Sequence, residues 1–352
     1  MDKMNHSESL KNRLSVSLLL LVLTTSCVLP ACAASARKTI TARADALETA
    51  LSDADCNIRV PAADAYLEAI ATNLRASLIA LDTPYLEEDW VRKLKKWNVY
   101  DRYDVHIVNS PISNASTLGK DFALVHSRLL LELPKPEYLA ALLAHEYAHI
   151  SEEHTVEENV RYQTTVAVVT TTAMLGAAAQ AYSNAYSGSY NYGYQRPTPN
   201  TDWGQWMRNV MKLYSPFRKK DEIEADLRGL EIYLAAGYNP TDYLDTFKWL
   251  LQKHGDVNSP SHPRMSKRVD ALEQVYATMD LPQARIHMDH ASFQAVKDAV
   301  RMELLNMAAN SRFQMFENMA AALPIKDLRV YSCGIDTDFN DATQQYFDLL
   351  KK

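Results

Sequence analysis

The chain has 352 residues, a formal net charge of −6 and four cysteines. This length can bury one sizeable core, or a main domain with an appendage. The mild acidity offers no basic surface for nucleic acid, and no lysine- and arginine-rich block with interleaved aromatic residues is found. The sequence therefore argues against nucleic acid as a partner.

The N-terminus predicts an export signal. Lys3, Lys11 and Arg13 precede an uncharged run over residues 14–29. This run is short and flanked in the manner of a signal peptide, not of a core helix. We therefore interpret residues 1–36 as a signal peptide or a lipoprotein signal, and expect an exported protein of the periplasm.

Three fates of this segment are open. The stretch "LPAC" resembles a bacterial lipobox and would place a lipid on Cys32, giving a membrane-anchored lipoprotein. We prefer this interpretation slightly, although Pro30 is unusual at its position. Residues 34–36 offer an ordinary A-x-A cleavage site instead, and retention as an uncleaved anchor is the third alternative.

Two further cysteines follow the signal. Cys56 and Cys333 are the thiols that remain beside a lipid-bearing Cys32. Disulfides persist in the compartments that exported proteins reach, so this pair is a candidate disulfide. Two separately buried thiols are an equal alternative, because the sequence does not show that they lie close together.

The apolar patterns predict an α+β fold that is mostly helical. Residues 38–81 are expected to form two helices broken near Pro61, and alternation predicts strands over 103–110 and 121–127. Pro134 and Pro136 mark the start of a helix that carries residues 137–150. Further helices are expected over 221–236, 241–253, 264–279 and 287–319.

An uncharged segment separates these halves. Its apolar part, residues 164–179, predicts a helix that packs or touches a membrane, since it is too rich in threonine and alanine for a span. The tyrosine-rich tract over about residues 180–200 is expected to be a flexible surface insertion. A lid over a cleft is the alternative.

The stretch "HEYAH" at residues 145–149 predicts a metal site. Histidines four residues apart lie about 40° from each other around a helix, so His145 and His149 can reach one ion. In H-E-x-x-H, Glu146 polarises a metal-bound water and carries its proton, which is zinc-peptidase chemistry. A chance match is expected in roughly one chain of this length in a hundred, so a third ligand is needed.

Two familiar third ligands are missing. A metzincin needs Gly at 152 and His at 155, where the chain has Glu152 and Thr155. On a continuous helix His154 would lie about 140° from His149 and point away. A thermolysin-like pattern needs a glutamate near Val169, a region without charge.

The stretch "DEIEAD" supplies a better candidate. Glu222 and Asp226 lie on one face of the predicted helix, and Glu222 can complete a His₂Glu site with an open fourth position. Asp226 can accept the other ring N–H of a histidine ligand and fix its tautomer. Glu224 lies on the opposite face and is the weaker candidate. A charged surface pair is the structural alternative.

H-E-x-x-H followed by E-x-x-A-D resembles the HtpX-like/CAAX-prenyl-endopeptidase family of gluzincin zinc metalloproteases. Three other stretches are similar to family segments in the same order: "NASTLGKDFALVHSRLLLEL", "GYNP" at 237–240 and "SHPRMSKRVDAL". The similarity covers roughly residues 60–280. The chain departs from the family in having Thr117-Leu118-Gly119 where Pro-Gly-Gly is usual, and its single signal favours the exported branch.

The resemblance implies a minigluzincin-like core with a small sheet, an edge strand and C-terminal helices. It implies one Zn²⁺ per chain on His145, His149 and Glu222, with Glu146 as the base. The edge strand, Asn114, Ala115, Ser116 and Thr117, would bind extended substrates by β-augmentation. His262 would stabilise the oxyanion or block the metal, with capping of a helix as the structural alternative, and Arg268 is expected to be a structural ion-pair partner.

The expected organisation is a signal over 1–36, a metalloprotease domain over 37–282 and a helical extension over 283–352. The expected function is a zinc endopeptidase of the bacterial cell envelope, and its expected substrates are extended or misfolded envelope proteins. The alternative is a chaperone-like envelope protein with a self-blocked or inactive zinc site. Hydrolysis of another bond is disfavoured, because the sequence has no nucleophile elbow or second metal site.

Overall fold

A computed structural model describes residues 36–42, 45, 57–86, 103–110, 113–117, 122–158, 160–161, 219–257, 262–309 and 349. The chain divides into two compact units. The described residues 36–42 and 156–161 belong to one unit, and every element named below belongs to the other. None of the described helices combines the length and the apolar character that a membrane span requires.

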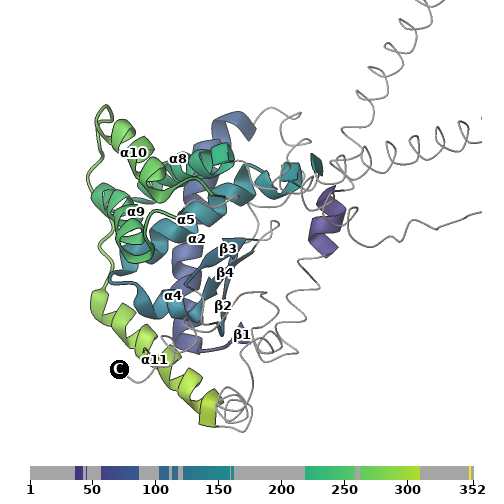
Figure 1. Cartoon of the computed structure of the whole chain (residues 1–352), viewed down its shortest axis with the longest axis vertical. Helices are drawn as coiled ribbons and strands as arrows, with labels where there is room; N and C mark the ends of the chain where they lie inside the picture. Colours follow the sequence, from purple (N-terminus) through teal and green to yellow (C-terminus); the bar gives the residue numbers. More distant parts are fainter. Residues whose placement is uncertain are drawn as a thin grey trace, which may run out of the picture. The chain divides into compact units, whose positions relative to one another are not determined.

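Helices dominate the larger unit, and the fold is α+β and mostly helical, as the sequence predicts (Figure 1). In chain order the elements are β1 (Asn57–Ile58), α2 (Pro61–Leu86), β2 (Asp104–Val108), β3 (Ala115–Thr117), β4 (Phe122–His126), α4 (Ser127–Glu132), α5 (Pro136–Ser151), α8 (Lys219–Ala236), α9 (Pro240–His254), α10 (Met265–Tyr276) and α11 (His290–Ala309).

The described strands form one mixed sheet in the order β1-β2-β4-β3. β2 and β4 are parallel, with Ile107 opposite Val125, while β1 and β3 pair antiparallel to their neighbours. Among the described strands β3 therefore stands at an edge. Both predicted strands are confirmed, but burial does not alternate along β2. Its last three residues are all buried in this interior strand, which lies between β1 and β4 and packs against α2.

The helices α2 and α9 each begin at a proline residue. α2 begins at Pro61, at the predicted break, and continues to Leu86 instead of ending at residue 81. The prediction of a helix before this break is wrong for residues 57–58, which form strand β1. The inner face of α2 contains the buried residues Leu67, Leu74 and Leu78. α9 begins with Pro240 behind Asn239, whose side chain accepts a hydrogen bond from the backbone N–H of Thr241.

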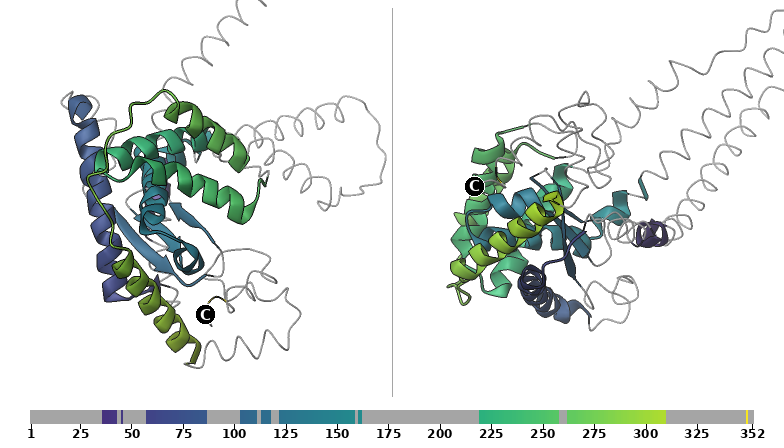
Figure 2. Two further views of the ribbon diagram at one scale, coloured as in Figure 1. Left: turned by 90° about the vertical axis from the view of Figure 1, so that its left-hand side faces the viewer. Right: turned by 90° about the horizontal axis from the view of Figure 1, so that it is seen from below.

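α5 is the central helix of the larger unit. It has Pro136 at its first turn, as predicted, and almost every residue along it is buried. α5 packs against β3 and β4, and also against α8 and α9 (Figure 2). α10 packs on α8 and α9, while α11 packs on α2 and α4. The HEYAH stretch thus lies between the sheet and the helices that follow it in the sequence.

Several predictions concern residues outside the described ranges. They are the export signal with Cys32, the disulfide partners Cys56 and Cys333, and the tyrosine-rich tract. The predicted helix over 164–179 and the end of the last helix beyond residue 309 also fall outside.

Candidate metal centre

The site forms where α8 crosses α5. Gly229 of α8 faces the backbone of α5, where an added Cβ would lie 3.0 Å from both Cα and N of His145. It would also lie 2.6 Å from the Tyr243 hydroxyl oxygen, which donates a hydrogen bond to the Asp226 carbonyl oxygen at 2.8 Å. The missing side chain therefore allows the two helices to approach closely enough for their side chains to meet.

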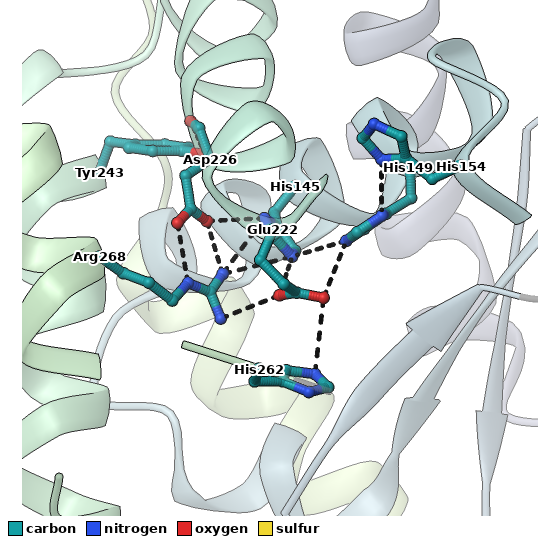
Figure 3. A network of polar contacts seen from close by, with 8 residues as sticks. All are labelled: His145, His149, His154, Glu222, Asp226, Tyr243, His262 and Arg268. Carbon is teal, nitrogen blue, oxygen red and sulfur yellow. Dashed lines mark hydrogen bonds and ion pairs between the residues drawn. The ribbon is translucent and has the colours of Figure 1, made fainter. Parts of the chain in front are cut away.

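The two histidines of HEYAH and Glu222 form one buried group (Figure 3). The Nε2 atoms of His145 and His149 are 3.2 Å apart. Glu222 Oε2 lies 3.8 Å from His145 Nε2, and Glu222 Oε1 lies 3.7 Å from His149 Nε2. Ligands bound at about 2.0–2.1 Å in a tetrahedron are separated by roughly 3.3 Å. The residues present therefore fit a zinc ion between them.

A buried ion pair orients His145. Its Nδ1 lies 2.9 Å from Asp226 Oδ1, so the structure brings Asp226 together with the first histidine of the motif. Arg268 of α10 donates from Nε to Asp226 Oδ2 at 2.8 Å, and its Nη1 lies 3.2 Å from Glu222 Oε2. Arg268 is buried as well. It compensates two carboxylates that would otherwise repel each other in a dry site.

The two histidines have different electrostatic surroundings. Burial is the largest single effect on His145 and lowers its pKa, but the hydrogen bond to Asp226 and the negative charges of Asp226 and Glu146 together outweigh it and leave the pKa above its ordinary value. Burial lowers the pKa of His149 well below its ordinary range, and the neighbouring His145 and His154 lower it further. His149 is therefore held neutral, as a metal ligand must be.

Glu146 lies beside this group on the side of the sheet. Desolvation of its carboxyl raises its pKa to about 7, while a hydrogen bond from the Thr117 backbone N–H opposes that shift. A carboxyl group with a pKa near neutrality can both accept and return a proton. The hydrogen bond from Thr117 connects this group to the last residue of the edge strand β3.

Of the other predicted edge residues, Ala115 and Ser116 lie on the same strand and Asn114 directly precedes it. Asn114 is exposed, and Ala115, Ser116 and Thr117 are half-buried. The Asn114 carbonyl oxygen accepts a hydrogen bond from the His126 backbone N–H, so pairing with β4 continues past the end of β3.

His262 lies at the opening of the group. Its Nε2 is 3.7 Å from Glu222 Oε1, and its side chain is half-exposed (Figure 3). The N-cap of α10 is Arg264, two residues further along the chain. His262 is therefore beside the metal group and is not the residue that caps α10. Glu224 points outward, with 53% of its side chain exposed, as the helix geometry predicts.

The expectation that His154 points away is wrong. α5 ends at Ser151, and Glu153 adopts a positive φ of 56°, so the chain turns before His154. The Nδ1 atoms of His154 and His149 are 3.0 Å apart, and both rings are buried. Helical angles placed His154 on the wrong face because they assume a helix that continues. A sequence signal for the end of α5 is the run of polar residues that begins at Ser151.

The comparison with protein families agrees with this geometry. The family model described as Peptidase family M48 matches residues 81–276, a little over half of the chain. The chain belongs to peptidase family M48. No curated protein matches it.

Membership of M48 confirms the resemblance inferred from the motifs, and it makes the protein a zinc-dependent metalloendopeptidase. The matched segment contains β2 to β4, the metal group and Arg268. It excludes most of α2 and all of α11, although both pack in the same unit.

Proposed function

We propose that this M48 peptidase works in the bacterial cell envelope and cleaves extended or misfolded polypeptides by Glu146-assisted attack of water. The observation that carries the proposal is the buried group of His145, His149 and Glu222, with Glu146 held between it and an edge strand. An envelope chaperone would need the binding edge but not the base.

The residues divide the chemistry among them. His145, His149 and Glu222 would hold the zinc ion, which would act as a Lewis acid toward a carbonyl oxygen and a water molecule. Glu146 accepts the proton of the attacking water and returns it to the leaving amine, a role for which it is positioned between the metal group and Thr117. Asp226 and Arg268 keep the ring of His145 in place through their buried contacts.

The edge strand supports an extended substrate. β3 is paired with β4 on one side only among the described strands, and the backbone of its last residue reaches Glu146. A chain added alongside β3 would bring a peptide bond next to the base. Main-chain bonding of this kind recognises extended backbone more than side chains, so unfolded chains are favoured.

The envelope location rests on the N-terminal sequence. The basic residues, the uncharged run and "LPAC" support export and a lipid on Cys32. Fractionation of cells that express the full chain and Cys32→Ser tests this. Wild type in the membrane fraction with the variant released to the periplasm supports a lipoprotein, whereas wild type in the cytosol contradicts export.

Metal content and casein cleavage test the active site. Wild type, Glu146→Gln and Glu222→Ala are compared after reconstitution with zinc. We expect one zinc per chain in wild type, and retained zinc with cleavage reduced about 100-fold or more in Glu146→Gln. Glu222→Ala is expected to lose both. Cleavage by Glu146→Gln at the wild-type rate would contradict the assignment of the base.

The same proteins separate the peptidase from a chaperone-like protein. A folded substrate and its denatured form are offered in parallel, and faster cleavage of the denatured form is expected. Zinc binding with suppression of aggregation but no cleavage would favour the chaperone. His262→Ala is informative whichever result is found. Activity gained with zinc retained indicates that His262 is a blocking ligand, whereas activity lost with zinc retained indicates that it stabilises the oxyanion.

A further inference from the structure

His154 follows the HEYAH helix and is one of its buried neighbours. Its side chain is 3% exposed, and its ring meets that of His149 edge-on, with centroids 5.0 Å apart. The positive φ of Glu153 directs the chain back toward α5, which places His154 Nδ1 3.0 Å from His149 Nδ1 (Figure 3). Two buried ring nitrogens at this distance share one proton in a hydrogen bond.

The direction of this hydrogen bond follows from the metal group. His149 Nε2 faces His145 Nε2 and Glu222, so it must keep its lone pair to act as a ligand. A neutral imidazole that is unprotonated at Nε2 carries its proton on Nδ1. His149 Nδ1–H is therefore the donor, and His154 Nδ1 is the acceptor.

The same argument shows that the other ring nitrogen of His154, Nε2, is protonated. Because Nδ1 accepts, neutral His154 carries its proton on Nε2. That nitrogen lies 3.8 Å from Glu224 Oε2, and Asp221 is the third member of this group. Asp221 is buried, whereas Glu224 is half-exposed and can reach the N–H through a rotamer change or a bridging water. The protonated end of His154 therefore lies near an acidic pair, and neither carboxylate forms a direct hydrogen bond with Nε2 in the structure.

This proton also decides between two uses of the group. His154, Asp221 and Glu224 have the residue types of a second metal site. A metal on His154 Nε2 would require both ring nitrogens of His154 to be unprotonated, that is, an imidazolate. A donor N–H facing carboxylates needs no such species, so the hydrogen-bonded arrangement is favoured.

We propose that His154 is a positioning residue that fixes the tautomer and ring orientation of His149 through the contact between their Nδ1 atoms. The inference rests on the metal ligands proposed above. His145 has a charged acceptor in Asp226, which is neutralised by Arg268, while His149 has a neutral acceptor. The site thus orients both ligands without adding another buried carboxylate next to the zinc.

Zinc affinity of the full chain tests this, measured by competition with a chromophoric chelator. His154→Phe keeps a ring but removes the acceptor, and we expect affinity to fall about 10- to 100-fold. His154→Asn places an acceptor oxygen near the position of Nδ1 and should recover most of the loss. The visible absorption of the Co²⁺-substituted proteins should change in His154→Phe and return toward wild type in His154→Asn. Wild-type affinity and spectrum in His154→Phe would overturn the inference.

A measurement on wild type does not depend on the folding of a variant. In the zinc-loaded protein, the ring-nitrogen shifts of isotope-labelled histidines should show His154 protonated on Nε2 and His149 on Nδ1. A proton on His154 Nδ1 would overturn the inference. So would two zinc ions per chain of which one is lost in His154→Phe.

His149→Ala and Glu222→Ala separate this inference from the function on which it rests. Loss of tight zinc binding in both establishes the ligands, and an unaffected His154→Phe then overturns only the role of His154. Wild-type zinc affinity in His149→Ala or Glu222→Ala would show that the ligand set is wrong, and the inference would be overturned with it.

Discussion

At the scale of single residues, His145 and His149 present their Nε2 atoms to one point but are held by different neighbours. Asp226 holds one ring, and His154 meets the other. The sequence predicted the first contact, because Glu222 and Asp226 are four apart on one helix. The second contact was not predicted, because the sequence did not show that α5 ends at Ser151 and that the chain turns at Glu153.

Another buried histidine predicts a pH-dependent stability. His126 lies at the end of β4 with its Nδ1 2.9 Å from the Ser110 hydroxyl oxygen, and burial lowers its pKa to about 4. Below pH 6.5 the unfolded state binds a proton that the folded state excludes. The free energy of unfolding therefore decreases as the pH is lowered. Between pH 7.5 and 5 this contributes about 2 kcal/mol, at 1.36 kcal/mol for each pH unit below 6.5.

Urea unfolding of the metal-free protein checks this prediction. His126→Asn removes the ionisable group, so the unfolded state no longer binds the extra proton. The decrease in the free energy of unfolding between pH 7.5 and 5 should therefore be about 2 kcal/mol smaller than in wild type. His287, which is exposed, supplies the control: His287→Asn should keep the wild-type slope. Equal slopes in all three proteins would contradict the prediction, because they would show that the pKa of His126 is the same in the folded and unfolded states.

At the scale of elements, the crossing of α5 and α8 decides whether the site exists. Glu222 meets the histidines because Gly229 lets α8 lie against the backbone of His145. Arg268 on α10 then joins Glu222 and Asp226. The sequence predicted all three helices but gave no sign that this glycine is their contact point.

Gly229→Ala is expected to destabilise the protein, although this change normally stabilises a helix interior by about 0.5–1 kcal/mol. The new methyl group would overlap the Tyr243 hydroxyl and press on the His145 backbone. Overpacking of this kind costs about 1–3 kcal/mol. Urea unfolding measures the loss, and zinc competition should show weaker binding, because the two helices carry different ligands.

Removing the hydroxyl in the same background provides a control. Tyr243→Phe should cost less in the Gly229→Ala protein than in wild type, because it relieves the overlap as well as breaking the hydrogen bond to Asp226. A Gly229→Ala protein that is as stable as wild type would mean that α5 and α8 have room to separate.

At the scale of the whole molecule, the compact unit that holds the site is larger than the family segment. α11 lies beyond residue 276, yet it packs on α2 and α4, and its Lys297 Nζ donates to the Leu133 carbonyl oxygen at 2.8 Å. Phe293 of α11 packs against Tyr66 of α2, with ring centroids 5.9 Å apart. The resemblance could not reveal this packing, because it stops before the helix begins.

Phe293→Ala should therefore destabilise the unit that holds the metal site. Truncating a buried phenylalanine costs about 3–5 kcal/mol, and Phe293 is 3% exposed. Circular dichroism and zinc release during urea unfolding should shift together. Met302→Ala on the same helix, at an exposed position, should change stability by no more than about 0.5 kcal/mol. An unchanged midpoint of zinc release in Phe293→Ala would make α11 an independent appendage.

The sequence by itself determined the chemistry of this protein: the H-E-x-x-H spacing, the distant glutamate with its aspartate, the helix starts at proline and the family. These features are local, because the angle between side chains on one helix follows from their spacing alone. Only the tertiary structure decided what lies between helices: the close approach at Gly229, the buried Arg268, the hydrogen bond from Thr117 to Glu146 and the return of His154 to His149. Each of these depends on how separate elements pack or on where a helix stops, and neither follows from the periodicity of a single segment.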